Sequence, residues 1–170
     1  MPDIRLEPWG EDDFPLVEKL MGDPEMTTHL AGPESPEKLA ERHERYLRAN
    51  NSTARMLKIV GEETGEAVGS VGYWEKEWRG ELIYETGWGV LPPFQGRGIA
   101  SAATALAIEL ARAERKHRYL HAFPTPDNGA SNAICRKLGF ELLGEVEFEF
   151  PPGHVAPSND WRLDLFASDV

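Results

Sequence analysis

The spacing of apolar residues along the chain separates predicted strands from predicted helices. Apolar side chains alternate with polar ones in some segments and recur every third or fourth position in others, which is typical of strands and of helices respectively. Strands are predicted at residues 4–8, 55–60, 66–76, 81–91, 119–123, 141–150 and 161–166. Helices are predicted at residues 12–21, 35–49, 100–115 and 131–138, with loops at 22–32 and 151–159.

The order of these elements, β-α-α-β-β-β-α-β-α-β-β, predicts an α/β fold. We expect a mixed, largely antiparallel sheet of seven strands with about four helices on its faces, because residues 66–76 and 81–91 form a hairpin through Trp78–Arg79–Gly80. A chain of 170 residues is long enough for one domain with a proper core, so residues 1–170 are taken as a single domain.

The strand predicted at 81–91 carries a carboxylate and two glycines at alternate positions. If this strand runs without a bulge, Glu85, Gly87 and Gly89 share one face of the sheet. Two adjacent glycines on one face weaken a strand, so they indicate a place where another molecule approaches the backbone closely.

The charge and the cysteine content narrow the classes of partner. With 29 acidic and 18 basic residues the formal net charge is −11, which argues against nucleic acid or an anionic membrane as the main partner. The one cysteine, Cys135, cannot form an internal disulfide. The sequence shows neither a secretory signal nor an apolar run of the ~20 residues that span a bilayer. We therefore expect a cytoplasmic protein. His117 and His121 have no acidic or cysteine partner at ligand spacing, so no metal is expected.

A glycine-rich segment, Gln95-Gly96-Arg97-Gly98-Ile99-Ala100, lies between a predicted strand and the most alanine-rich helix. Glycines leave backbone N–H groups unshielded, and a helix N-terminus carries the positive end of the macrodipole, so a pyrophosphate fits there. The segment lacks the Gly-Lys-Ser/Thr of a P-loop and the third glycine of a dinucleotide fingerprint. On its own, such a turn is more often only a turn.

Three blocks in the right order resemble the GCN5-related N-acetyltransferases (GNAT). They are the strand residues 85–92, the glycine-rich segment 95–100, and residues 127–140, which carry Asp-Asn-x-x-Ser followed by Lys-x-Gly-Phe. The third block is similar to the branch that contains the ribosomal-protein N-terminal acetyltransferases. The resemblance implies the acetyltransferase fold and transfer of an acetyl group from acetyl-coenzyme A to an amine, without a metal.

The resemblance also implies where coenzyme A binds. The pyrophosphate would lie on the loop amides of Gln95, Gly96, Arg97, Gly98, Ile99 and Ala100 with Ser101. The pantetheine arm would lie between two splayed strands and pair with the backbone near Val90, and Asn128 matches an asparagine that reaches the pantetheine.

Acyl transfer needs a neutral amine, a site for the developing oxyanion, and protonation of the leaving thiolate. Glu85 matches a strand carboxylate that serves as general base in several relatives, although a strand glutamate in solvent is the alternative. The oxyanion would bind the N–H at or near Val90. Many relatives use a tyrosine to protonate the thiolate, and this chain has Cys135 at that position. The candidate proton donors are therefore Ser131, which we prefer, and Cys135. A lone cysteine in a helix is more often a buried packing residue.

The acceptor is predicted to be an amine-bearing small molecule or a peptide N-terminus. Glu145, Glu147 and Glu149 share one face of a regular strand, so either they form an acidic rim that attracts a small cationic amine or they are a solvated face. Trp74 and Trp161 are candidate walls of the acceptor pocket. The alternatives are a non-catalytic acyl-coenzyme A binding or sensor module and an enzyme with a longer acyl donor; a homodimer is left open.

Overall fold

The computed structural model of the protein describes residues 2–51 and 53–167. Its elements run in the order β1 (Ile4–Pro8), the 3₁₀ turn η1 (Glu11–Asp13), α1 (Phe14–Met21), α2 (Pro36–Ala49), β2 (Ala54–Gly61), β3 (Ala67–Trp78), β4 (Glu81–Val90), the 3₁₀ turn η2 (Pro92–Phe94), α3 (Ile99–Glu114), β5 (Tyr119–Ala122), α4 (Gly129–Lys137), β6 (Glu141–Glu149) and β7 (Val155–Asp164). The predicted order of strands and helices is confirmed.

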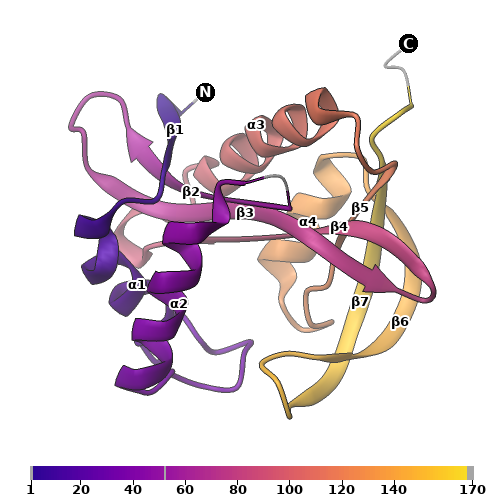
Figure 1. Ribbon diagram of the computed structural model, residues 1–170, viewed down its shortest axis with the longest axis horizontal. Coiled ribbons are helices and arrows are strands. Elements are labelled where there is room, and N and C mark those ends of the chain that lie inside the picture. Colours follow the sequence, from indigo (N-terminus) through magenta and orange to yellow (C-terminus); the bar gives the residue numbers. More distant parts are fainter. Residues whose placement is uncertain (1, 52, 168–170) are drawn as a thin grey trace.

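The seven strands form one mixed sheet in the order β1-β2-β3-β4-β5-β7-β6. Neighbouring strands are antiparallel except β4 and β5, which are parallel. Helix α3 covers one face of the sheet, and α1 and α2 lie on the other side (Figure 1). The predicted largely antiparallel sheet is therefore confirmed, and its single parallel pair stands at its centre.

Helices α2 and α3 show why these segments are helical. The Ser35 hydroxyl oxygen accepts a hydrogen bond from the Lys38 N–H at 3.3 Å, and Pro36 takes the first helical position. Helix α3 buries Ala103, Ala107 and Ala111 along one stripe, so it can approach the sheet closely.

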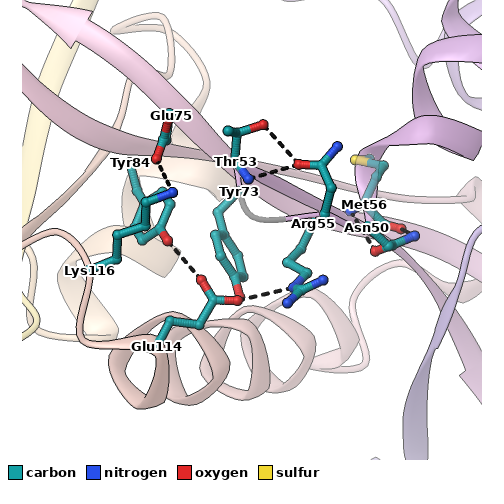
Figure 2. Close-up of polar contacts among 10 residues, drawn as sticks. Asn50, Thr53, Arg55, Met56, Tyr73, Glu75, Tyr84, Glu114 and Lys116 are labelled. Atoms are coloured by element: carbon teal, nitrogen blue, oxygen red, sulfur yellow. Dashed lines mark hydrogen bonds and ion pairs between the residues drawn. The ribbon is translucent and has the colours of Figure 1, made fainter.

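A polar cluster fastens the C-terminal end of α3 to the middle of the sheet (Figure 2). The Glu114 carboxylate accepts hydrogen bonds from the hydroxyls of Tyr73 at 3.0 Å and Tyr84 at 2.7 Å, and from Arg55 Nε at 3.0 Å. These three donors come from β3, β4 and β2 respectively. The cluster therefore joins three strands to one helix end.

The largest error of the sequence prediction concerns the last strand. Residues 151–159 were expected to be a loop, but β7 begins at Val155 and pairs with β6 from Glu149↔Val155 to Glu141↔Arg162. The segment has Pro157 and Asn159, which are rare inside strands, so its composition concealed a pairing that β6 imposes. The first helix was also predicted too early, because Glu11–Asp13 form a 3₁₀ turn before α1.

Candidate active site

A cavity of about 700 Å³ lies where α1, α2 and α4 meet the sheet. This volume is within the range of small-molecule sites. Its walls come from segments that are distant in the sequence, from Leu20 in α1 to Ser158 in β7. Its aromatic lining residues are Tyr46, Trp74, Trp88, Phe123, Phe148 and Phe150.

Glu85 lines this cavity from β4. The pairing of β3 with β4 is continuous from Gly69↔Val90 to Trp78↔Glu81, so β4 has no bulge in this ladder. Trp74 lies opposite Glu85 and donates a hydrogen bond from its Nε1 to the carboxylate at 3.2 Å. Burial raises the pKa of Glu85 to about 7, against the smaller lowering effects of Lys76 and the Trp74 hydrogen bond. At neutral pH this group is therefore able to accept a proton.

The two glycines after Glu85 face the same side as the carboxylate. A Cβ on Gly87 would meet the Trp74 ring at 3.2 Å, and a Cβ on Gly89 would meet Leu20 of α1 at 3.4 Å. Trp88, between them, lines the cavity and also packs against the main apolar core. The alternation predicted from the sequence is present, and the glycines keep the cavity open along β4.

Strand β4 separates from β5 directly after Glu85, because the parallel pairing is confined to Tyr84↔Leu120 and Glu85↔His121. The Leu91 N–H donates to the Val68 carbonyl oxygen in β3 at 2.9 Å. Since successive amides of a strand alternate in direction, the Val90 N–H points to the opposite edge, into the gap beside β5. This edge can pair with an extended ligand or with a developing oxyanion.

The glycine-rich segment lies beyond the end of β4, outside the lining of the 700 Å³ cavity. Gly96 and Gly98 have φ values of +76° and +78°, and Gly98 is the N-cap of α3 without a side-chain cap. The first α3 bond runs from the Ala102 N–H to the Gly98 carbonyl at 3.1 Å, so the N–H groups of Ile99, Ala100 and Ser101 have no partner within the helix. This geometry is suited to an anion.

The side chain of Gln95 connects this segment to β4. Its Nε2 donates to the Val90 carbonyl oxygen at 2.8 Å and lies 3.6 Å from the Met26 sulfur. Arg97 is exposed, with its guanidinium 5.9 Å from the centre of the Phe94 ring. Gln95 therefore orients the loop, whereas Arg97 faces solvent.

Asn128 and Ser131 line the cavity from the N-terminus of α4. The Asn128 Oδ1 accepts the Ser131 N–H at 3.2 Å, so Asn128 is the N-cap of this helix. Among the described residues, the Ser131 hydroxyl has no hydrogen-bond partner within the chain. This hydroxyl is therefore able to donate a hydrogen bond to a ligand.

Cys135 lies one turn further along α4, four residues after Ser131 and deeper in the protein. Its side chain is fully buried in the main apolar core and does not line the cavity. Burial raises the pKa of the thiol to about 12. The position of Cys135 matches the packing alternative that the sequence left open.

The structure bears on two further expectations, the acidic residues of the last strands and the aromatic walls of the acceptor pocket. Glu145, Glu147 and Glu149 share one exposed face as predicted, but none of them lines the cavity, which receives Phe148 and Phe150 instead. Trp74 is a cavity wall, whereas Trp161 is buried in the core and donates from Nε1 to the Asn132 Oδ1 at 2.8 Å.

The contribution of α2 to the cavity was not predicted from the sequence. Arg42, Arg45 and Arg48 all line it, together with Arg55 from β2. The three α2 arginines are spaced three residues apart, which is a signal that they share a face, but nothing in the sequence indicates that this face meets Glu85.

Within residues 2–51 and 53–167, no cluster of three or more His, Cys, Asp or Glu side chains is arranged to hold a metal ion. In the same residues, no helix combines the length and apolar character that a membrane crossing requires.

The structure thus contains an unbulged strand with a half-buried glutamate, a gap where β4 parts from β5, and a glycine-rich helix start. A family sequence model described as an acetyltransferase (GNAT) domain matches residues 3–141. The chain therefore belongs to the GNAT acetyltransferases, which transfer an acetyl group from acetyl-coenzyme A to amines. No curated relative matches the sequence.

Solved structures agree with this fold at low sequence identity. A GNAT-family acetyltransferase from Bacillus anthracis aligns with a TM-score of 0.79 at 18% identity, covering 96% of this chain and 95% of its own. Spermidine N-acetyltransferase from Vibrio cholerae, solved with CoA and spermine, gives 0.77 at 14% identity over 96% of each chain. Ribosomal-protein-S5-alanine acetyltransferase from Vibrio fischeri gives 0.76 at 15% identity, covering 98% of this chain and 95% of its own.

Proposed function

We propose that the protein acetylates an amine by direct attack on acetyl-coenzyme A, with Glu85 as the general base. The observation that carries this proposal is the half-buried Glu85 carboxylate, with a pKa of about 7, in a cavity that opens where β4 leaves β5. A base with this pKa is matched to a proton transfer near neutral pH. The acceptor is a small amine or a peptide N-terminus, in keeping with the amine substrates for which the similar Vibrio structures are named.

In this reaction the amine nitrogen attacks the thioester carbonyl carbon, so a C–N bond forms and the C–S bond breaks. The nitrogen loses one proton to Glu85, and the carbonyl oxygen accepts a hydrogen bond from the Val90 N–H while it carries negative charge. The departing thiolate accepts a hydrogen bond from the Ser131 hydroxyl and takes up one proton. Glu85 then releases its proton to solvent, so the proton count balances.

The residues of this chain fit acetyl-coenzyme A as donor substrate. The pyrophosphate would meet the unpartnered N–H groups at the start of α3 and the backbone of residues 95–98. The pantetheine would extend along the free edge of β4 toward Val90, with the Asn128 amide group at its side. A Cβ on Gly96 would meet no atom within 4 Å, so the space above this loop is open to a ligand.

The direct test is release of coenzyme A thiol from acetyl-coenzyme A in the presence of a panel of amines. We expect release that depends on the amine, together with an acetylated product detected by mass spectrometry. A protein that binds acetyl-coenzyme A tightly but releases no thiol with any amine would instead be a binding or sensor module, and the proposal would be wrong.

The phosphate-binding role of the loop is tested by Gly98→Val with Gly65→Val as a matched control. Both glycines have positive φ, at +78° and +69°, so both variants carry similar backbone strain of about 1–3 kcal/mol. Only Gly98 lies at the start of α3, and Gly65 lies in the turn between β2 and β3. We expect calorimetry to show loss of acetyl-coenzyme A binding in Gly98→Val alone; equal affinities in both variants would refute the assignment.

The thiolate partner is tested by Ser131→Ala and Cys135→Ala. Removing the Ser131 hydroxyl is expected to lower kcat, because the thiolate then leaves without a hydrogen bond. Removing the buried Cys135 thiol is expected to lower stability with a normal kcat, because it leaves a small void in the core. Normal turnover in Ser131→Ala with a large loss in Cys135→Ala would transfer the role to the thiol.

A further inference from the structure

The side chains that line the cavity around Glu85 include more basic than acidic groups, in contrast to the protein as a whole. The chain carries a formal net charge of −11, yet among residues 2–51 and 53–167 the cavity lining includes four arginines and a single carboxylate, Glu85. Arginines gathered on one wall of a cavity in an acidic protein indicate a ligand with negative charge on that side.

Two of these arginines are already neutralised. Arg42 is buried and donates to both oxygens of Glu34, from Nε and Nη2 at 2.6 Å each, and to the Tyr46 hydroxyl at 3.0 Å. Arg55 donates to Glu114 in the polar cluster of Figure 2. Their geometry is fixed by these partners, so neither needs a ligand.

Arg45 and Arg48 differ from this pair. Arg45 is exposed, lines the cavity from α2, and makes no hydrogen bond or ion pair with another residue among 2–51 and 53–167. Arg48 has only an exposed ion pair with Glu44 at 3.7 Å, and such pairs contribute little. The cavity therefore offers one guanidinium without a partner and a second that is weakly held.

Aromatic and hydrogen-bonding groups complete the lining of the cavity. Phe150 and the exposed His154, at the β6–β7 connection, line the same cavity, as do Tyr46 of α2 and Trp74 of β3. Trp74 also donates to Glu85, so the aromatic surface reaches the proposed base. The cavity lining thus combines a carboxylate, aromatic rings and guanidinium groups.

We propose that the acceptor amine also carries a carboxylate, which Arg45 binds, with an apolar body between the two groups. This inference rests on the proposed function, because it places the amine at Glu85. A guanidinium presents two parallel N–H donors that match the two oxygens of a carboxylate. A polycationic amine would instead be repelled by the same wall. The acceptor class is thus an amino acid or a short peptide with a free carboxylate. Of the two alternatives for Glu145, Glu147 and Glu149, this proposal agrees with the solvated face.

The test uses matched acceptors that differ only in the carboxylate. Thiol release is measured with phenylalanine and glycyl-phenylalanine, each against its C-terminal amide, and with spermine. We expect kcat/KM to be about tenfold higher for the free acid than for the amide in at least one pair, the size of a charge-assisted hydrogen bond. Turnover of the amides or of spermine with equal or greater efficiency would overturn the inference while leaving the proposed function intact.

Substitutions in α2 test whether Arg45 is the side chain that causes the preference for a carboxylate. Arg45→Ala is expected to raise KM for the acid with little change in kcat, to leave the amide unaffected, and to be partly rescued by Arg45→Lys. Lys38→Ala removes an exposed cation from the same helix outside the cavity, so both acceptors should keep their wild-type efficiency. An unchanged preference in Arg45→Ala would refute the role of Arg45.

Two binding measurements decide whether Arg45 contacts the acceptor or the coenzyme. The Kd of acetyl-coenzyme A, measured by calorimetry, should be the same in Arg45→Ala and wild type; a large loss would assign Arg45 to a coenzyme phosphate and overturn the proposal. Binding of N-acetyl-phenylalanine and N-acetyl-glycyl-phenylalanine against their amides, with coenzyme A present, tests the carboxylate site without turnover. Stronger binding of an acid, lost in Arg45→Ala, would support the site even if no amine were acetylated, and equal binding would refute it.

Discussion

Glu85 and Glu114 both contact β3 and β4, but their surroundings give the two carboxyl groups different properties. Glu85 lies in the cavity on one face of β3 and β4, and Glu114 lies on the other face at the end of α3. Burial acts on both carboxyls in the direction that raises the pKa. At Glu114, hydrogen bonds from Tyr84, Arg55 and Tyr73 outweigh burial and lower the pKa.

At Glu85 the balance is reversed, because its hydrogen-bonding partner is a single indole N–H at 3.2 Å. Burial therefore dominates and the pKa rises to about 7. A carboxylate with three donors is held ionised and joins elements together, whereas one with a single donor is free to exchange a proton. The deeper burial of Glu85 and its smaller number of donors together separate the proposed catalytic glutamate from the structural one.

The largest expected effect is on the rate of Glu85→Gln. This change keeps the shape and removes the base, so kcat should fall by roughly 10²–10⁴ at neutral pH. In the wild type, kcat/KM should rise with pH through a midpoint near 7 as Glu85 ionises, and this step should disappear in the variant. Glu81→Gln, at an exposed position of the same strand outside the cavity, should behave like wild type. A retained pH–rate step in Glu85→Gln would remove Glu85 from the mechanism.

The same raised pKa has a consequence for stability. Between the ordinary value of 4.5 and about 7, folded Glu85 keeps a proton that the unfolded chain has lost, so the free energy of unfolding should fall as pH rises from 5 to 8. The full shift corresponds to about 3 kcal/mol, and partial exposure reduces this to about 1–2 kcal/mol. Urea unfolding of wild type and Glu85→Gln at both pH values measures the difference; identical slopes with pH would contradict it.

Glu114→Gln should change stability and leave chemistry almost intact. The amide offers one oxygen to three donors, so we expect a loss of about 1–2 kcal/mol in the free energy of unfolding. The pH midpoint of kcat/KM should stay near 7. Glu109→Gln, an exposed site on the same helix, is the control for the lost charge. A shift of the pH midpoint in Glu114→Gln would show that the two carboxyls are coupled.

The smallest effect is expected from Trp74→Phe, which removes the indole donor to Glu85 and keeps an aromatic ring in the cavity wall. Because the hydrogen bond lowers the pKa of Glu85, its loss should move the kcat/KM midpoint upward by a few tenths of a pH unit. Trp78→Phe removes an indole donor from Asp160 instead and should leave the midpoint in place. A downward shift in Trp74→Phe would show that the indole N–H does not stabilise the ionised Glu85.

Much of the fold follows from local signals in the sequence. The cap at Ser35 with Pro36 begins α2 where it was expected, and the positive-φ glycines at 96 and 98 form the turn into α3. The period of two along β4 places Glu85, Gly87 and Gly89 on one face. These features depend on neighbouring residues only, so one sequence is enough to predict them.

The rest depends on packing between distant segments. Strand β7 extends back to Val155 because β6 supplies a partner for it, despite Pro157. Ser131 and Cys135 are four residues apart on α4, and only the docking of this helix against the core sends the thiol inward and leaves the hydroxyl at the cavity.

The charged residues that line the cavity likewise could not be predicted from neighbouring residues in the sequence. The run of glutamates at 145–149 suggested an acidic rim, but the alternation of β6 turns Phe148 to the cavity and the carboxylates to solvent. Arg45 comes from a helix some forty residues before Glu85, and only the folding of α2 over the sheet brings it to the same cavity. The sequence by itself determined which residues we propose for coenzyme A binding and proton transfer, because these proposals rest on local motifs. The tertiary structure decided which charged side chains line the cavity, because its lining is assembled from α2, β4 and β6, which no local pattern connects.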